Sequence, residues 1–352
     1  MKNAKYVLTS LFLASCSQAP SASAPISKQP SFIITSSPLP LEEKVEEVRV
    51  TTDPLNFEIT PCPEGMANIG NKFCIDRYEA SVVDKFTRVF ASPHYIPSQE
   101  GYHDADWQYD IFSKMEIDEK ILSRLITEGQ PVDMPVHGAE QYQTFEPFAV
   151  SVPGKIPASY VNKVTAEQAC ENAGKRLCTR KEWYKACVGP DRPAPYFEER
   201  KKNGEKDVVE IFPEVRPYGD SYQKGKCNLG LQINRWPPGI LGRKNNGQML
   251  DPRISVLLGT DGQPMKRATG SFPECTNGYG VYDMLGNVHE IVSDTRIATK
   301  FPRERVTYVG SHYARSGKES CAEVTADHWA SYTDYSLGFR CCTDIKEGNI
   351  QH

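Results

Sequence analysis

The cysteines constrain this chain more than any other feature of its sequence. There are eleven, of which ten lie between Cys62 and Cys342 and one, Cys16, stands apart near the start. So many cysteines are unusual in a reducing cytosol and typical of exported domains. Because ten is an even number, we expect five disulfides. A zinc–thiolate cluster is the alternative, but the closest pairs, such as Cys170 with Cys178, lack the C-x2-C spacing of such clusters.

The first residues have the composition of an export signal. Lys2 and Lys5 supply positive charge, the stretch from Tyr6 to Ala14 is apolar, and small residues follow. That stretch is too short to span a bilayer, and no later stretch approaches the ~18 apolar residues that a membrane helix needs. We therefore expect the chain to leave the cytoplasm.

The string Leu13-Ala14-Ser15-Cys16 resembles the bacterial lipobox, in which the cysteine is acylated and becomes the first residue of the mature chain. We predict a signal peptide at residues 1–15 and lipidation of Cys16. The alternative is an ordinary secretion signal cleaved near Ala22 or Ala24. Ser17 stands where an aspartate would favour retention at the inner membrane in the lipoproteins that this start resembles, which favours an outer-membrane lipoprotein.

The segment after Cys16 is too polar to fold. Residues 17–40 are dominated by Ser, Pro, Ala and Gln, and residues 41–50 are an acidic run with scattered valines. Such a composition cannot bury enough apolar surface to order itself. We predict a lipid-anchored disordered tether at 16–58, one folded domain at 59–345 and a tail at 346–352.

The net charge of −4 comes from interspersed acidic and basic residues. There is no basic stripe to neutralise phosphates, so we expect no nucleic-acid partner.

Short apolar stretches at Phe73–Ile75 and Phe148–Val152 favour strands. Thr165-Ala166-Glu167-Gln168 and Thr179-Arg180-Lys181-Glu182 are capping boxes, which predict helices that end before Gly174 and Gly189. The apolar spacing from Tyr109 to Thr127 predicts a third helix, packed on the core, with a partner-binding face as the alternative.

Four blocks, in this order, resemble the formylglycine-generating enzyme and sulfatase-modifying factor family. They are Cys74-Ile-Asp-Arg-Tyr-Glu79, Gly174-Lys-Arg-Leu-Cys-Thr-Arg-Lys-Glu-Trp-Tyr-Lys-Ala-Cys187, Asn277-Gly-Tyr-Gly-Val-Tyr-Asp-Met-Leu-Gly-Asn-Val-His-Glu290 and Leu337-Gly-Phe-Arg-Cys341. The resemblance implies an α+β fold class: a single compact C-type-lectin-like domain, low in regular secondary structure and rich in disulfides. It covers residues 62–344 apart from insertions near 95–145 and 195–260.

The chemistry of that family depends on a pair of cysteines, a few residues apart, after a Gly-Gly-Ser-aromatic motif. Thiolates suit the copper ion that these enzymes use because both are soft. Here the stretch starts Val309-Gly-Ser-His-Tyr-Ala-Arg, so the first cysteine position falls on Ala314 and the second near Ser316 or Glu319. We therefore expect no copper and no catalytic residues, which makes the protein a pseudoenzyme.

The resemblance implies disulfides between Cys187 and Cys321 and between Cys170 and Cys341. For the other six cysteines, pairing Cys62 with Cys74, Cys227 with Cys275 and Cys178 with Cys342 is one of several possible connectivities. A free, reactive Cys321 is the alternative that would restore thiol chemistry.

The resemblance also implies structural calcium, held by Asp283, Glu290 and the carbonyls of Gly286 and Val288. Buried carboxylates repel each other unless a cation is near, and no Lys or Arg lies between Tyr279 and Thr295. A second calcium site would use the following groups: the side chains of Asn228 and Asp261 and the carbonyls of Leu229 and Gln263. The alternative at both sites is that the carboxylates only cap turns.

Three histidines, His289, His312 and His328, offer a small metal site, although single histidines in loops are more often structural. Asp76 and Glu79 form a second pair of acidic groups, for which an ion pair with Arg77 is the structural interpretation.

We expect a non-catalytic binding or scaffold lipoprotein of the bacterial envelope, whose domain is periplasmic or surface-exposed and holds a peptide, a glycan or another envelope protein. The alternative is an enzyme or modifying factor that acts on an exported protein through His312, Tyr313, Arg315 and a metal.

Overall fold

The computed structural model describes residues 61–98, 144–202, 205–230, 251–259, 261–297, 304–315, 319–326 and 328–345. The predicted signal peptide, Cys16, the tether, the helix at Tyr109–Thr127 and the tail lie outside these residues, so each of them stays a prediction. Among the described residues, no helix has the length and apolar character to cross a membrane.

The first four-stranded sheet joins the two ends of the domain. Its strands, in spatial order, are β1 (Met66–Ile69), β2 (Phe73–Asp76), β12 (Cys341–Asp344) and β5 (Arg176–Leu177). Every neighbouring pair is antiparallel. The strand predicted at Phe73–Ile75 is thus β2, and it lies in the interior of this sheet because β12 pairs with it.

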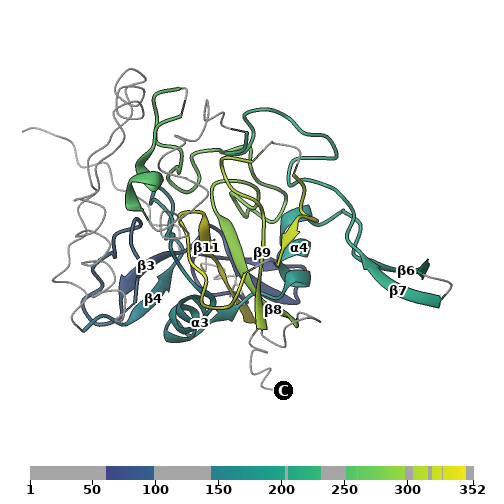
Figure 1. Ribbon diagram of the computed structural model, residues 1–352, viewed down its shortest axis with the longest axis horizontal. Coiled ribbons are helices and arrows are strands. Elements are labelled where there is room, and N and C mark those ends of the chain that lie inside the picture. The colour runs from purple at the N-terminus through teal and green to yellow at the C-terminus, as the bar shows by residue number, and fades with distance from the viewer. Residues whose placement is uncertain are drawn as a thin grey trace, which may run out of the picture. The chain divides into compact units, whose positions relative to one another are not determined.

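The second four-stranded sheet carries the candidate site. Its order is β10 (Val324–Thr325), β9 (Glu304–Val309), β8 (His289–Ile297) and β11 (Leu337–Phe339). Strands β8 and β9 are antiparallel, whereas β11 runs parallel to β8, with Leu337 opposite His289 and Gly338 opposite Glu290. Figure 1 shows these three strands side by side. The parallel pairing brings together two of the sequence blocks, Asn277–Glu290 and Leu337–Cys341.

Two hairpins complete the regular strands of the described residues. Strand β3 (Ser81–Asp84) pairs with β4 (Pro147–Val150), which covers most of the strand predicted at Phe148–Val152. Strands β6 (Tyr196–Lys202) and β7 (Glu205–Ile211) form a two-stranded ribbon within the predicted insertion near 195–260. The short 3-10 helix η3 (Pro252–Val256) lies in the same insertion.

Both helices predicted from capping boxes are present, but only one begins where expected. Helix α4 (Arg180–Val188) has the capping box of Thr179 and Glu182 and ends at Gly189, whose φ is +93°. Helix α3 (Lys163–Asn172) begins earlier than Thr165. Its N-cap is Asn162, whose side chain accepts the amide proton of Thr165 at 2.8 Å. Asparagine is at least as good an N-cap as threonine, so the helix can begin directly after Asn162.

Buried apolar loops form as much of the core as the regular elements. Helix α3 packs against β4 and β5. The apolar residues of the loop that precedes β8, namely Val281, Met284, Leu285 and Val288, are 0–1% exposed. The first three pack in one cluster with Trp183 of α4 and the end of β9. The fold class predicted from the sequence, a compact α+β domain with little regular structure, is therefore confirmed.

Five disulfides join these parts of the domain. They are Cys62–Cys74, Cys170–Cys341, Cys178–Cys342, Cys187–Cys321 and Cys227–Cys275. Cys170–Cys341 and Cys187–Cys321 are the pairs that the resemblance implies, the other three are one of the connectivities left open for the remaining six cysteines, and the number agrees with the even cysteine count. Two of them fix adjacent residues of β12, one to α3 and the other to the residue after β5. Five disulfides are typical of a domain that folds outside the reducing cytosol.

Candidate functional site

The turn that follows β9 corresponds to the position where the resembled enzymes carry their chemistry. Gly310 and Ser311 both have left-handed backbones, with φ of +82° and +64°. A Cβ on Gly310 would lie 2.9 Å from the Trp183 ring, so only glycine fits there. The Gly310 carbonyl accepts the amide proton of Gly286 at 2.8 Å. The turn is thereby held against the buried loop that precedes β8.

No free thiol lies at this turn among the described residues. Ala314, the first cysteine position of the family, is half-buried. Ser316 lies outside the described residues, and Glu319 is described but carries no sulfur. Cys321 is bonded to Cys187, and the ten cysteines from Cys62 to Cys342 are all in disulfides. Within the described part of the chain, thiolate chemistry therefore has no group to use.

The three histidines that the sequence pointed to gather beside this turn. The rings of His289, the first residue of β8, and His312 have centroids 4.9 Å apart. Tyr308 of β9 packs against His289, with centroids 4.9 Å apart, and lies 6.3 Å from His328. His328 stacks on Tyr332 at 3.7 Å. His289 and His312 are thus direct neighbours, whereas His328 reaches them through Tyr308.

Four polar atoms of this cluster are buried without a hydrogen-bond partner. They are Nδ1 of His289, Nδ1 of His312, the hydroxyl of Tyr313 and the hydroxyl of Ser311. Burial, together with the charge of Arg315, lowers the pKa of His289 to about 3, although a hydrogen bond to the backbone of Val309 acts the other way. Burial also lowers the pKa of His312 well below its usual value. Both imidazoles are therefore neutral near pH 7.

A second buried cluster surrounds Arg340. Its Nε and one terminal nitrogen each donate to the Glu290 carboxylate at 2.7 Å, and the indole of Trp183 donates to the same carboxylate at 2.6 Å. All three side chains are at most 1% exposed. Both carboxylate oxygens of Glu290 are therefore occupied by donors from the protein.

Glu79 and Asp283 lie close to this ion pair. Glu79 accepts protons from the side chain of Asn287 at 2.5 Å and from the backbone amide of Val288 at 3.1 Å. Burial and the nearby Asp283 and Glu290 carboxylates raise the pKa of Glu79 well above its ordinary value. Burial also raises the pKa of Asp283 to about 6. The guanidinium of Arg340 is therefore shared among three acidic groups.

The predicted use of Arg77 as partner of Asp76 or Glu79 is not what the structure shows. Asp76 is fully buried and forms its ion pair with Lys175, at 2.6 Å. Arg77 instead donates to the carbonyl of Gly280 at 3.0 Å. Arg77 follows the last residue of β2, and its side chain is directed to the loop at Gly280 and not toward Asp76 or Glu79.

The first predicted calcium site does not fit a calcium ion with its residues placed in this way. Both oxygens of Glu290 face Arg340 and Trp183, and one oxygen of Asp283 accepts the amide proton of Gly270 at 2.6 Å. A dication bound to Glu290 would lie against a buried guanidinium, which costs electrostatic energy. Gly286 and Val288 lie in the same loop, but their carbonyls alone do not make a site.

The second predicted site is less firmly occupied by the protein's own groups, although Asp261 has partners as well: one oxygen pairs with Arg267 and the other accepts the amide proton of Gln263 at 3.1 Å. Asn228 is 1% exposed, and its Oδ1 is buried without a partner, whereas its amide nitrogen donates to Met265 and Asn287. The neighbouring Leu229 is buried as well. Two of its predicted ligands lie close together, because a Cβ on Gly259 would lie 2.9 Å from Oδ1 of Asp261 and 3.7 Å from the Gln263 carbonyl, but that carbonyl already accepts the amide proton of Gly259 at 2.7 Å. Calcium at this site remains a prediction.

No three His, Cys, Asp or Glu side chains within the described ranges are arranged to hold a metal ion. The residues that sequence analysis missed are Trp183, Asn287 and Arg340, which organise the buried carboxylates. All three stand in the four sequence blocks, but no pattern of neighbouring residues indicates that they bind the buried carboxylates.

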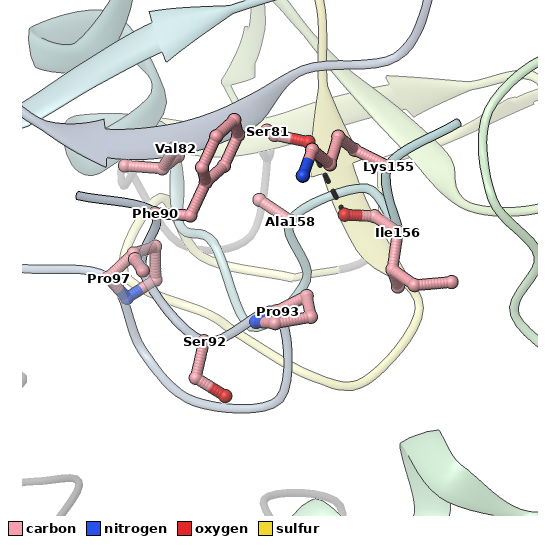
Figure 2. A pocket seen from close by; sticks show the side chains of 10 residues that line it. Ser81, Val82, Phe90, Ser92, Pro93, Pro97, Lys155, Ile156 and Ala158 are labelled. Atoms are coloured by element: carbon pink, nitrogen blue, oxygen red, sulfur yellow. Dashed lines mark hydrogen bonds between the residues drawn. The ribbon is translucent and has the colours of Figure 1, made fainter. Parts of the chain in front are cut away.

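A small pocket of about 220 Å³ lies beside β3 (Figure 2). Its polar groups are Ser81, Ser92 and Lys155, and the hydroxyl of Ser81 donates to the carbonyl of Ile156 at 3.3 Å. The rest of its lining is apolar: Val82, Phe90, Ala91, Pro93, Pro97, Ile156 and Ala158. Ligand sites for drug-sized molecules span about 300–1,000 Å³, so the described walls suit a single side chain better than a whole small molecule.

Known proteins align with this chain in sequence and in structure. The formylglycine-generating enzyme of Mus musculus is 26% identical over 294 residues, which are 77% of this chain and 66% of that enzyme. Among solved structures, PvdO from Pseudomonas aeruginosa aligns with a TM-score of 0.35 and 17% identity, covering 78% of this chain and 80% of PvdO. CarF aligns with a TM-score of 0.26 and 18% identity, covering 78% of this chain and 87% of CarF.

The sequence pattern of the sulfatase-modifying factor enzyme 1-like domain matches residues 47–345. That match includes every described residue and all four sequence blocks. The chain therefore belongs to the sulfatase-modifying factor enzyme 1-like domain family.

Proposed function

We propose that the protein is a lipid-anchored, non-catalytic binding or scaffold protein of the bacterial envelope. The observation that supports this most is the lack of a free cysteine where the family carries its reactive pair. Ala314 stands at the family's first cysteine position, and Cys321 is bonded to Cys187. A domain that keeps the family's fold without a free thiol retains a surface for recognition but not the family's reaction, and a fold by itself does not specify a reaction.

The proposed location combines two features. Five disulfides are typical of an exported domain. The lipobox-like string ending at Cys16, followed by Ser17, favours a lipid anchor at the outer membrane. The ligand in this proposal is a peptide, a glycan or another envelope protein, held by a domain that is periplasmic or surface-exposed.

The test of the non-catalytic role is a reaction that the family's enzymes perform. The purified protein is incubated with copper, oxygen and a sulfatase-type cysteine peptide, and the mass of the peptide is followed, with a formylglycine-generating enzyme as positive control. We expect no change in peptide mass. Copper-dependent conversion of the cysteine would refute the proposal.

The binding role has a test of its own. The anchored protein is crosslinked in intact cells, and the partners that it captures are compared with those captured by a control lipoprotein carrying the same anchor and tether. We expect a partner specific to the domain. Identical capture by both proteins would contradict a binding function.

A second function has a specific observation in its favour. The unpaired ring nitrogens of His289 and His312 lie beside Tyr313 and Arg315. These groups are what a modifying factor acting on an exported protein through a metal would use. The peptide assay does not exclude such a reaction, because it reports only on cysteine oxidation.

A further inference from the structure

His289 and His312 each present a ring nitrogen for which the protein supplies no partner. Both are Nδ1 atoms, and the two side chains are only 3% and 7% exposed. Buried polar groups in folded proteins are nearly always satisfied by protein, water or an ion. Two unsatisfied nitrogens in adjacent rings therefore point to a common bound species.

The tautomer of His289 is fixed by the sheet in which it lies. The backbone of Val309 acts on this ring as a hydrogen-bond acceptor, and because Nδ1 has no partner, we assign that contact to Nε2. A neutral imidazole has one N–H, so Nδ1 carries a free lone pair. Histidines that bind metals usually donate their other N–H to a carbonyl or carboxylate in this way.

The separation of the rings matches two ligands of one ion. Zinc binds imidazole nitrogen at about 2.0–2.1 Å, so the ring centroid lies about 3 Å from the ion, and two such rings at a tetrahedral angle have centroids about 5 Å apart. The observed distance is 4.9 Å, with the ring planes inclined by 52°. Tyr308 packs on His289 and Tyr335 on His312, which holds both rings in place.

We propose that His289 and His312 together bind one borderline transition-metal dication, for which Zn²⁺ is the probe. Imidazole nitrogen suits such ions, whereas calcium prefers oxygen. These two rings supply only two ligands, so the remaining coordination positions would be filled by water or by neighbouring groups, among which the buried hydroxyls of Ser311 and Tyr313 also lack a hydrogen-bond partner. This site is distinct from both predicted calcium sites, and it is compatible with a binding protein as well as with an enzyme, so its test does not depend on the proposed function.

Arg315 determines how strong such a site is. It is exposed and acts electrostatically on both rings. Its positive charge opposes a bare dication, and two protein ligands bind less tightly than three or four. We therefore expect modest affinity for zinc.

The test uses the full chain with Cys16→Ser, which removes only the predicted lipid anchor. After dialysis against a chelator, zinc is titrated calorimetrically. We expect one zinc per chain and at least a tenfold loss of affinity in His289→Gln and in His312→Gln. Glutamine can still donate from the position of Nε2 but lacks Nδ1. His94→Gln is the matched control, because Nδ1 of His94 already pairs with Ser255 at 2.6 Å.

A measurement without substitution covers the case in which a variant fails to fold. In the full Cys16→Ser chain labelled with ¹⁵N and carrying both histidines, zinc should shift the Nδ1 resonances of two histidines at the stoichiometry found by calorimetry. Absence of zinc binding, unchanged affinity in both folded variants, or unshifted Nδ1 resonances would each overturn the proposal. Whether or not zinc binds, the capture experiment and the peptide assay still test the proposed function independently.

Discussion

Arg340 and Glu290, which lie 50 residues apart in two different sequence blocks, form a buried ion pair. Two hydrogen bonds of 2.7 Å join the guanidinium to the carboxylate, and neither side chain is more than 1% exposed. The same guanidinium also donates to the carbonyls of Asp76 and Tyr282, which lie far apart in the sequence. Arg340 thus connects both ends of the domain as well as balancing the charge of the carboxylates.

Replacing Arg340 should destabilise the domain more than replacing its partner. Arg340→Met would leave the Glu290 carboxyl group without its cation beside two further acidic groups, and breaking a buried pair in this way costs about 3–5 kcal/mol. Glu290→Gln removes one charge and keeps the other carboxylates near Arg340, so its cost should be smaller. Urea unfolding of both variants measures this. Equal losses, or a neutral Arg340→Met, would contradict the assigned role.

Arg340 also shows what sequence reasoning found and what it missed. No Lys or Arg lies between Tyr279 and Thr295, whereas the parallel pairing of β11 with β8 brings Arg340 to these carboxylates from far along the chain. Features that depend on neighbouring residues were predictable, such as the capping box of Thr179 and Glu182. Contacts between distant blocks were not, because several pairings of strands were consistent with the same apolar pattern.

The N-cap of α3 shows a local limit as well. Two residues, Asn162 and Thr165, are both good caps, and the choice between them depends on where Lys163 packs: its backbone amide bonds to Ala330 at 3.1 Å. A tertiary contact therefore decided the helix boundary. The predicted ion pair of Arg77 was wrong for the same reason, since the partners of Asp76 and Arg77 are both supplied from far along the chain.

Asp283 should make the domain more stable in mild acid than at neutral pH. Burial, with Glu290 nearby, raises its pKa from 3.8 to about 6, against the opposing effect of the Gly270 amide and Arg340. The folded state therefore binds the proton more tightly than the unfolded state. The resulting stabilisation is present below the ordinary pKa and is lost as the pH rises through the raised one.

Asp283→Asn is the matched variant for this effect. Asparagine can still accept the Gly270 amide, and it tolerates the φ of +57° that this position adopts. Urea unfolding between about pH 4 and pH 7 should show that the stability of the unsubstituted domain falls relative to the variant as the pH rises. Parallel pH profiles would show that Asp283 does not titrate in this range.

All ten cysteines of the domain should resist thiol reagents until they are reduced. In the Cys16→Ser chain, we expect no reactive thiol under denaturing conditions and ten after reduction, because the five pairs account for every other cysteine. Peptide mapping without reduction checks the individual pairs. A free thiol at Cys321 would restore the catalytic alternative, and a different partner for Cys187 would contradict the fold near α4.

Cys16→Ser should release the protein from membranes into the soluble periplasmic fraction. The reason is that the predicted lipid at Cys16 is its anchor, and the first apolar stretch is too short to span the bilayer. Fractionation of cells and metabolic labelling with a fatty acid measure both consequences. A variant that stays with the membrane, or an unsubstituted protein that takes up no label, would favour the ordinary secretion signal instead.

Calcium, if it stabilises this domain, should act through Asn228 and Asp261 and not through Glu290. The oxygen of Asn228 is buried without a partner, and Asp261 and the Gln263 carbonyl flank one space beside Gly259. Glu290 is buried with its oxygens bound to Arg340 and Trp183, whereas the Asp261 side chain, which pairs with Arg267, is 49% exposed and can exchange that partner more easily. An ion that binds only the folded state adds about 2.7 kcal/mol at a hundredfold excess over its Kd. The melting temperature should therefore rise with calcium in the metal-free protein.

Asp261→Asn should abolish that rise, and Asp283→Asn should leave it intact. The opposite pattern would mean that Arg340 moves aside for an ion at the first site, while an unchanged melting temperature in all three proteins would leave these carboxylates as turn caps and internal ion pairs only.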